Sequence, residues 1–178
     1  KVFAYNLVKH YRYAYKLFAC NGILFNHESP RRGANFVTNK VVKNSVRIAL
    51  GLQKTLEVGN IHAYRDWGHA KDYVRAMNMI INYKKADDWV VATGKARSVG
   101  QMIDYVFKKL NLNRKKHLRI NKKFFRPEEL KYLQGDSSKT RKHLKWKPEY
   151  TFEGMLDEML DFWLDFYKNN NHENKFNY

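Results

Sequence analysis

Hydrophobic and polar residues follow two kinds of pattern along this chain, which together predict a mixed α/β protein. Apolar residues that recur every three to four positions predict helices; such segments cover residues 1–15, 35–50, 70–82, 98–110, 138–144 and 152–167. Short apolar runs bounded by polar residues or glycine predict strands; they cover residues 17–25, 55–58 and 89–92, with a less distinct candidate at 117–120.

The last helix has the most regular pattern, a single apolar stripe that predicts core packing. Ser98 and Gln101 have the spacing of a capping box at the start of another helix, and Gly51 is a typical residue just after a helix end. The polar stretch from Asn169 predicts a frayed tail. The stripe consists of Phe152, Met155, Leu156, Met159, Leu160, Trp163 and Tyr167.

The sequence begins inside a helical pattern, with lysine rather than methionine at position 1. A natural helix start carries a capping residue such as Ser, Thr, Asp or Asn, and none precedes the first apolar position. We therefore expect a fragment of a longer protein. No internal repeat or linker interrupts the pattern, so we expect one compact unit or part of one.

The charge is strongly positive, with 34 Lys and Arg against 17 Asp and Glu and a formal net charge of +17. Such an excess can indicate a nucleic-acid partner. However, the lysines are scattered through every segment and no RNA- or DNA-reading motif is present. We expect no nucleic acid as a partner, and a basic nucleic-acid-binding module is the alternative from a different functional class.

The remaining composition narrows the class of protein further. Cys20 is the single cysteine and cannot form an internal disulfide, so it predicts a small buried side chain in a reducing compartment such as the cytoplasm. The apolar runs are too short for a membrane span. The seven histidines lack metal-ligand spacing, so we expect no metal site.

A polar loop is predicted at residues 26–33, directly after the strand at 17–25. In α/β proteins ligands bind outside the carboxyl ends of strands, and the paired arginines Arg31 and Arg32 suit a phosphate group. A second polar loop is predicted at residues 64–69, and a turn at 126–129, where Pro127 favours an extended residue before it.

The segment NGILFNHESPRRGANFVT, residues 21–38, resembles the GDP-mannose 4,6-dehydratases, a nucleotide-sugar family of extended short-chain dehydrogenases/reductases. The motif RDWGHAKD at 65–72 and the pair RPEE and LQGD at 126–129 and 133–136 carry the same resemblance. It implies an α/β fold, the C-terminal part of an NAD(P)-binding Rossmann fold with the smaller mixed α/β substrate-binding domain of these enzymes.

The resemblance also implies a division into domains. Residues 1–34 correspond to the last part of the Rossmann domain. Residues 35–168 correspond mainly to the nucleotide-sugar-binding domain, with 69–110 returning partly to the Rossmann domain. Residues 169–178 are the polar tail.

The catalytic pair of this enzyme class is Tyr-x-x-x-Lys, which puts both side chains on one helix face, where the ammonium lowers the tyrosine pKa. By resemblance Lys1 is this catalytic lysine, and its tyrosine, with a catalytic Thr and Glu, belongs to the missing N-terminal half. The same spacing occurs at Tyr5 and Lys9 and at Tyr105 and Lys109. Both pairs are expected to be surface or packing residues, with Tyr5 as the alternative catalytic tyrosine.

The resemblance assigns ligand contacts residue by residue. Lys1, His27 and Arg32 are expected to bind the cofactor, NADP, whereas Arg31 is as consistent with a solvated or subunit contact as with a ligand role. Asp66 is expected to orient a neighbour, Trp67 to pack, and His69 and Asp72 to be structural. The expected substrate-binding residues are Asn26, Lys40, Arg65, Arg126 and Glu129.

The expected function of the intact protein is that of the resembled family. It is the NADP-dependent conversion of GDP-mannose to GDP-4-keto-6-deoxy-mannose, a precursor of GDP-fucose, by a hydro-lyase that forms homodimers or homotetramers. No Gly-x-Gly turn for a pyrophosphate occurs in the sequence, so the fragment alone is expected to be inactive. Another nucleotide-sugar dehydratase or epimerase is the nearest alternative.

Overall fold

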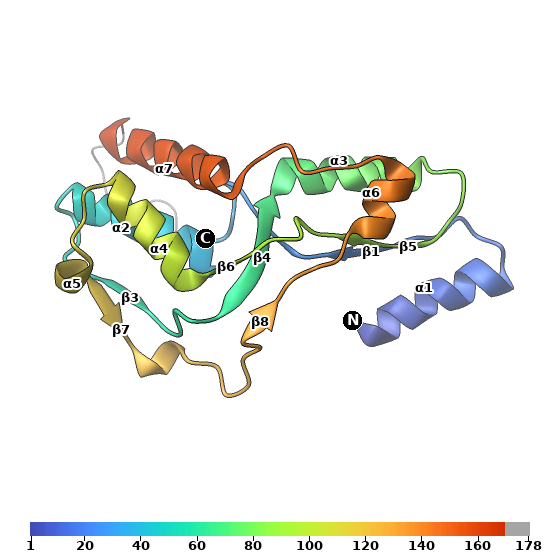
Figure 1. Cartoon of the computed structure of the whole chain (residues 1–178), viewed down its shortest axis with the longest axis horizontal. Coiled ribbons are helices and arrows are strands. Elements are labelled where there is room, and N and C mark those ends of the chain that lie inside the picture. Colours follow the sequence, from blue (N-terminus) through green and yellow to red (C-terminus); the bar gives the residue numbers. More distant parts are fainter. Residues whose placement is uncertain (170–178) are drawn as a thin grey trace.

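The computed structural model describes residues 1–169, so the predicted tail after Asn169 lies outside the described residues. The described part is elongated, with several helices grouped at one end and the first helix lying apart at the other (Figure 1). Its helices are α1 (Val2–Ala14), α2 (Val37–Ala49), α3 (Ala70–Ile81), α4 (Val99–Lys109), α5 (Arg114–His117), α6 (Ser138–Leu144) and α7 (Phe152–Asn169), with a 3-10 turn η1 (Lys122–Phe124).

The strands of the described residues form three small sheets. β1 and β5 pair in parallel, as do β3 and β7. In the third sheet β4 is the centre, parallel to β2 and β8 and antiparallel to β6. The strands are β1 (Asn21–Leu24), β2 (Asn26–Glu28), β3 (Leu56–Val58), β4 (Tyr64–His69), β5 (Asp88–Val91), β6 (Ala96–Ser98), β7 (Leu118–Ile120) and β8 (Tyr132–Leu133).

The buried apolar side chains form two clusters. The larger, the helical core, gathers residues of α2, β3, α4 and α7 around Trp67 of β4. The smaller, the sheet core, joins α3 and β5 to the end of α6 and the segment after it. It consists of Tyr73, Ala76, Ile80, Trp89, Val91, Leu144 and Trp146.

The regular elements predicted from periodicity are largely confirmed. All six predicted helices are present, with ends within a few residues of those predicted, and so are the strands near 55–58, 89–92 and 117–120. The whole α7 stripe packs in the helical core. The capping box is also confirmed, since the Ser98 hydroxyl accepts from the Gln101 backbone N–H at 3.0 Å and the Gln101 side chain accepts from Ser98 at 2.8 Å.

The predicted buried strand at 17–25 was partly wrong. β1 covers only residues 21–24, Leu17 and Phe18 lie outside it, and Ile23 is 42% exposed. The reason is that β1 pairs with β5 alone among the described residues, so one edge and much of its surface lack a neighbour. Cys20, predicted to be buried, is half-buried against the sheet core.

Both segments predicted as polar loops contain a strand: the first in part and the second over its whole length. Residues 26–28 form β2, and the predicted loop at 64–69 is β4, the central strand of its sheet. Polar residues occupy β4 because they have partners inside the protein: the buried carboxylate of Asp66 accepts backbone N–H groups of Thr93 at 2.9 Å, Gly94 at 2.9 Å and Gly135 at 3.2 Å. The short elements β6, β8, α5 and η1 were not predicted.

Candidate active site

One cleft of about 610 Å³ brings together all five residues expected to bind substrate. They come from separate elements, so chain segments distant in sequence converge here. Arg32, expected to bind the cofactor, lines the same cleft. The polar lining includes Asn26, Arg32, Asn35, Lys40, Asn60, Arg65, Arg126 and Glu129.

The two walls of the cleft are built differently. One wall carries Asn26 of β2 and Lys40 of α2, which are held by regular elements of the fold. The opposite wall is the segment from η1 to β8, which carries Arg126 and Glu129. Apolar side chains including Trp67 and Phe124 complete the surface, so the cleft combines hydrophobic contact with a few charged groups, as small-molecule sites generally do.

Arg65 of β4 ties the second wall to the sheet. Its Nη1 donates to the backbone carbonyl oxygens of Tyr64 and Leu130 at 2.7 Å each, and its Nη2 lies 3.4 Å from Glu129 Oε1. The other carboxylate oxygen of Glu129 accepts from Asn60 Nδ2 at 3.0 Å. Arg65 therefore holds the 126–130 segment against β4, and Glu129 is fixed from two sides.

Lys40 is partly withdrawn from water. Its ammonium nitrogen lies 3.5 Å from the centre of the Phe124 ring, a cation–π contact across the cleft. Partial burial lowers the pKa of Lys40, opposed by the nearby Glu57 carboxylate. A desolvated ammonium gains more from an anionic ligand than an exposed one does, because the interaction is less screened.

Sequence reasoning did not single out Glu28, whose carboxylate lies against the cleft residue Arg32. Its side chain is almost fully buried, with Oε2 3.1 Å from Arg32 Nε, and the N–H is not aligned for a hydrogen bond, so the pair is mainly electrostatic. Burial raises the pKa of Glu28 to about 7, although Arg32 lowers it. The Arg32 guanidinium also lies 3.4 Å from the centre of the Phe36 ring. The i, i+4 spacing of Glu28 and Arg32 is the signal that could have found the pair.

His27 and Lys1, two of the expected cofactor ligands, do not line this cleft. His27 stacks on Tyr73 with ring centres 4.9 Å apart, and its Nδ1 lies 2.8 Å from the Phe25 carbonyl oxygen, which makes Nδ1 the donor. Lys1 precedes the first turn of α1, at the end of that helix that points toward the middle of the molecule (Figure 1). The roles assigned to both residues stay predictions.

The two internal Tyr-x-x-x-Lys matches have local explanations. The Tyr5 hydroxyl donates to Asp88 at 2.9 Å, and this hydrogen bond raises the tyrosine pKa. For Tyr105, burial and a hydrogen bond to Asp157 raise the pKa as well. A catalytic tyrosine of this class needs a lowered pKa, so both tyrosines have the wrong electrostatic surroundings.

His69 and Asp72 have structural partners. His69 Nδ1 accepts the Lys71 backbone N–H at 3.0 Å, so Nε2 carries the proton and donates to Glu158 at 2.7 Å. Asp72 is buried and accepts the backbone N–H groups of Glu149 and Tyr150. Trp67 packs in the helical core.

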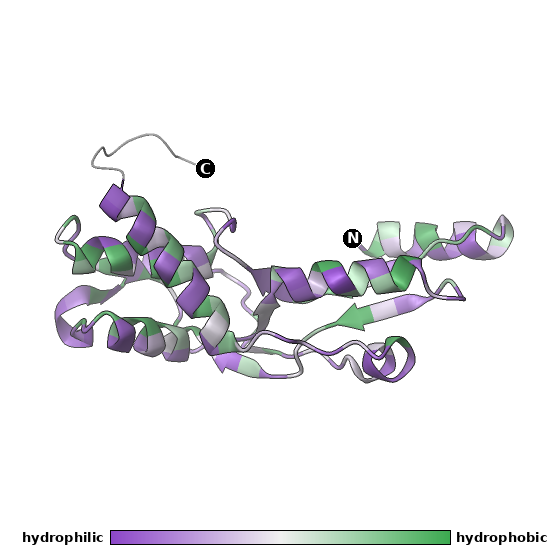
Figure 2. Ribbon diagram, turned by 90° about the horizontal axis from the view of Figure 1, so that it is seen from above, coloured by the Kyte–Doolittle hydropathy of each residue, from purple (hydrophilic) through white to green (hydrophobic). Residues whose placement is uncertain are grey.

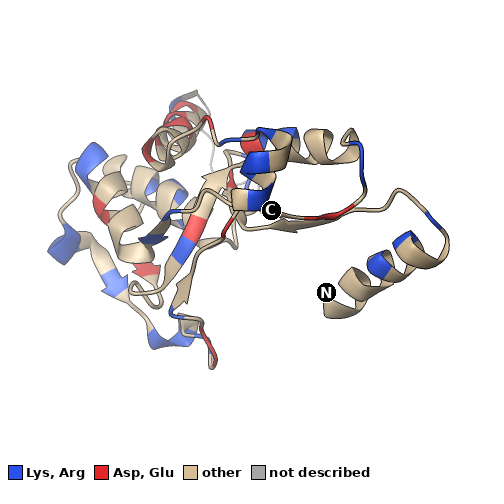
Figure 3. Ribbon diagram, turned by 45° about the vertical axis from the view of Figure 1, so that its right-hand side comes forward, with Lys and Arg blue, Asp and Glu red and all other residues tan. Residues whose placement is uncertain are grey.

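Charge is spread over the molecule rather than gathered on one element. Figure 3 shows Lys and Arg on helices, strands and loops at both ends. Within residues 1–169, no helix is long and apolar enough to cross a membrane. In the same part of the chain no group of three or more His, Cys, Asp or Glu has the arrangement of a metal site.

Comparison with known proteins places this geometry in a family. A family model described as GDP-mannose 4,6 dehydratase matches residues 1–159. GDP-mannose 4,6 dehydratase 1 of Arabidopsis thaliana is 52% identical over 151 residues, 85% of this chain and 42% of the plant protein. The GDP-mannose 4,6 dehydratase of Cricetulus griseus is 43% identical over 177 residues, 90% of this chain and 48% of its own length. The chain thus spans about half the length of the curated relatives it matches.

Solved structures confirm the expected fold. RMD from Pseudomonas aeruginosa, complexed with NADPH, matches with a TM-score of 0.82 at 21% identity, over 93% of this chain and 54% of that one. A dTDP-glucose 4,6-dehydratase from Bacillus anthracis in complex with NAD gives 0.78 at 18% identity, over 94% and 50%. At these identities the likeness establishes the fold, that of extended short-chain dehydrogenases/reductases.

Proposed function

Because the chain belongs to the GDP-mannose 4,6-dehydratase family, we propose that the protein of which it is part converts GDP-mannose to GDP-4-keto-6-deoxy-mannose, as a hydro-lyase. The chain supplies the substrate side of the site. The observation that carries the proposal is the convergence of Lys40, Arg65 and Arg126 on one cleft.

A sugar nucleotide presents a diphosphate, and this cleft suits one. Lys40 and Arg126 have no ion-pair partner among the described residues, and Arg65 shares its charge only with Glu129. Charged hydrogen bonds contribute about 1.5–3 kcal/mol each, so two or three of them hold the nucleotide with several kcal/mol. Asn26 then faces the sugar, and Glu129 accepts from ribose or sugar hydroxyl groups.

The reaction balances as an internal transfer of hydride with loss of one water. Hydride leaves C4 of the mannosyl ring while the C4 hydroxyl gives up its proton, which forms the 4-keto group; a carboxylate base then removes the C5 proton, and hydroxide leaves C6 with a proton as water. The hydride returns to C6 and a proton returns to C5. A bound nicotinamide supplies the acceptor and donor of that hydride. The residues of this chain orient the nucleotide so that first C4 and then C6 of the sugar can reach the nicotinamide.

The residues present suit part of an NADP molecule. The Arg32 Nη nitrogens have no hydrogen-bond partner in residues 1–169, since Glu28 faces only Nε, so they are available to a phosphate or ribose oxygen. His27 and Lys1 complete the proposed cofactor contacts, with Lys1 also lowering the pKa of the catalytic tyrosine. The choice of NADP over NAD is supported by the Pseudomonas aeruginosa neighbour, which was solved with NADPH.

The test is an assay of the protein with its natural upstream sequence restored, using GDP-mannose and catalytic amounts of NADP. We expect the 4-keto-6-deoxy product without net NADPH. Competition by UDP- and dTDP-sugars addresses the nearest alternative, another nucleotide-sugar dehydratase or epimerase, because a GDP-specific site is not inhibited by them. No turnover and no GDP-mannose binding would refute the proposal.

Three further properties belong to the same proposal. The product serves GDP-fucose synthesis, the location is the cytoplasm, and the intact protein is a homodimer or homotetramer. Size measurement by light scattering and fractionation of the source cells test the last two.

A further inference from the structure

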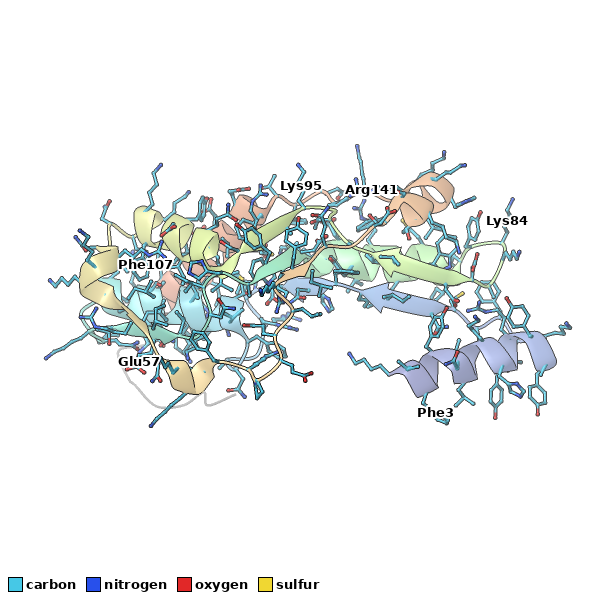
Figure 4. The ribbon with its side chains drawn as sticks, turned by 60° about the horizontal axis from the view of Figure 1, so that its bottom comes forward. Phe3, Glu57, Lys84, Lys95, Phe107 and Arg141 are labelled. Atoms are coloured by element: carbon cyan, nitrogen blue, oxygen red, sulfur yellow. The ribbon has the colours of Figure 1, made fainter. Side chains whose placement is uncertain are left out.

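The helix α1 is attached to the rest of the described chain by a polar network rather than by an apolar core. Of its side chains only that of Arg12 is buried, at 8% exposed, whereas Val2 and Phe3 are 76% and 79% exposed. Figure 4 shows Phe3 on the side of α1 that faces away from the sheets, and Figure 2 shows apolar turns on this isolated helix. Neither the helical core nor the sheet core contains an α1 residue.

The network centres on Asp88, the first residue of β5. Its Oδ1 accepts from Arg12 Nη2 at 2.5 Å and from Asn21 Nδ2 at 2.9 Å, and its Oδ2 accepts from the Tyr5 hydroxyl at 2.9 Å. Arg12 Nε also donates to the Ala19 carbonyl oxygen at 2.7 Å. Although partial burial raises the pKa of Asp88, these donors lower it overall, so the carboxylate stays charged.

The two contacts on α1 lie far apart along the helix. Tyr5 is in its first turns and Arg12 in its last, so a single carboxylate fixes both the position and the rotation of the helix about its axis. The backbone N–H of Tyr5 donates to the carbonyl oxygen of Lys1 at 3.0 Å. A contact that fixes Tyr5 therefore also fixes the position of the Lys1 backbone, from which the Lys1 side chain extends.

We propose that Asp88, through Arg12 and Tyr5, is the positioning residue that sets Lys1 relative to the cofactor. This inference rests on the proposed function for the role of Lys1. It assigns to Asp88 a part in the reaction although Asp88 does not line the cleft. It also explains why α1 carries a buried arginine.

The test compares Asp88→Asn with Asp87→Asn in the full-length protein. Asp87 is the adjacent carboxylate and pairs with Lys139 of α6 at 2.7 Å, with no contact to α1, so it is a matched control. For Asp88→Asn we expect kcat to fall on the order of 10- to 100-fold, since small misplacements of a catalytic group have effects of that size. The KM for GDP-mannose should change less than about twofold, because the cleft lies elsewhere. Tyr5→Phe, which removes one donor, should show a smaller loss in the same direction.

Hydrogen exchange of the same variants separates this inference from the proposed function. In Asp88→Asn, amides of residues 2–14 should exchange faster while those of α2 and α7 keep their protection; Asp87→Asn should leave both unchanged. Equal kcat and equal α1 exchange in the two variants would overturn the positioning role, as would loss of protection over the whole chain. An inactive wild-type protein would instead count against the proposed function, and the exchange comparison would still decide whether Asp88 anchors α1.

Discussion

The helical core and the α1 end of this molecule contain similar side chains but are stabilised in different ways. The helical core buries Val41, Met102 and Met159 completely. At the other end, Phe3 and Ile23 are exposed and the helix depends on hydrogen bonds. One region is complete within the described chain, whereas the other has an apolar surface that is available for contact with a further segment.

Each region also has a tyrosine, an aspartate and a cation in contact. In the α1 end, Tyr5 and Arg12 share Asp88, and the arginine is buried. In the helical region, Tyr105 and Lys109 share Asp157, and the lysine is 48% exposed. The same three groups can thus anchor a helix or contribute little to its stability, depending on whether an apolar core also holds that helix.

The largest expected effect tests the contrast in apolar packing. Leu156→Ala, in the fully buried part of α7, should lower the free energy of unfolding by about 2–5 kcal/mol because it leaves a cavity. Ile23→Ala in β1 should cost about 1 kcal/mol or less, since much of that side chain is already in water. Urea unfolding of both variants of the 178-residue chain measures the difference. Equal losses would mean that the α1 end is packed as tightly as the helical core.

The next effect concerns Glu28, on β2 between the two regions. The pKa of Glu28 is about 7 in the folded protein, above its value in the unfolded chain. The protonated carboxyl group is therefore fully compatible with folding below about pH 4.5, and the protein loses folding stability as the pH rises through 7. Glu28→Gln removes this loss. The variant should therefore gain stability relative to wild type between pH 5 and 8, by up to about 3 kcal/mol. Unfolding curves at several pH values check this, and a constant difference would contradict it.

Binding of the nucleotide is expected to depend on the cleft and not on the α1 end. Arg65→Ala should weaken GDP binding about 10- to 100-fold, because it removes a charged donor and frees the 126–130 segment. Lys84→Ala removes an exposed cation that does not line the cleft and that Figure 4 shows at the opposite end of the molecule from Glu57, so the affinity should stay unchanged. Calorimetric titration of GDP into each variant gives the comparison, and equal weakening would indicate non-specific attraction to a basic surface.

The smallest effect sharpens the comparison of the two aspartates. Asp157→Asn should change the free energy of unfolding by only about 0.2–1 kcal/mol, as exposed ion pairs generally do. Thermal unfolding in low and high salt measures it. A larger loss would show that the contacts of Asp157 with Tyr105 and Lys109 also anchor α4.

Elements with a local cause could be predicted from the sequence. The α7 stripe and the capping box at Ser98 depend on residues within one or two helical turns, and both are confirmed. The expected substrate residues came from the resemblance, and the structure brings all five to one cleft. Their roles in binding stay predictions.

What could not be predicted depends on distant partners. β4 looked like a loop because Asp66 is polar, yet its hydrogen-bond donors are 27 to 69 positions away. Glu28 looked like a loop carboxylate because nothing local shows its burial. The role of Arg12 was equally hidden, since its partner Asp88 is 76 positions further along the chain.

The carboxylate of Asp66 has a consequence for the order of folding. It binds the backbone at Thr93, Gly94 and Gly135, so β4 has no complete set of partners until residue 135 has been synthesised. Closing such long loops has an entropic cost before the contacts form, which makes parallel, non-local pairings slow. We therefore expect the sheet around β4 to form late, only once the segment that carries Gly135 is in place. A nascent chain stalled before Gly135 is then the species most exposed to aggregation and most dependent on chaperones.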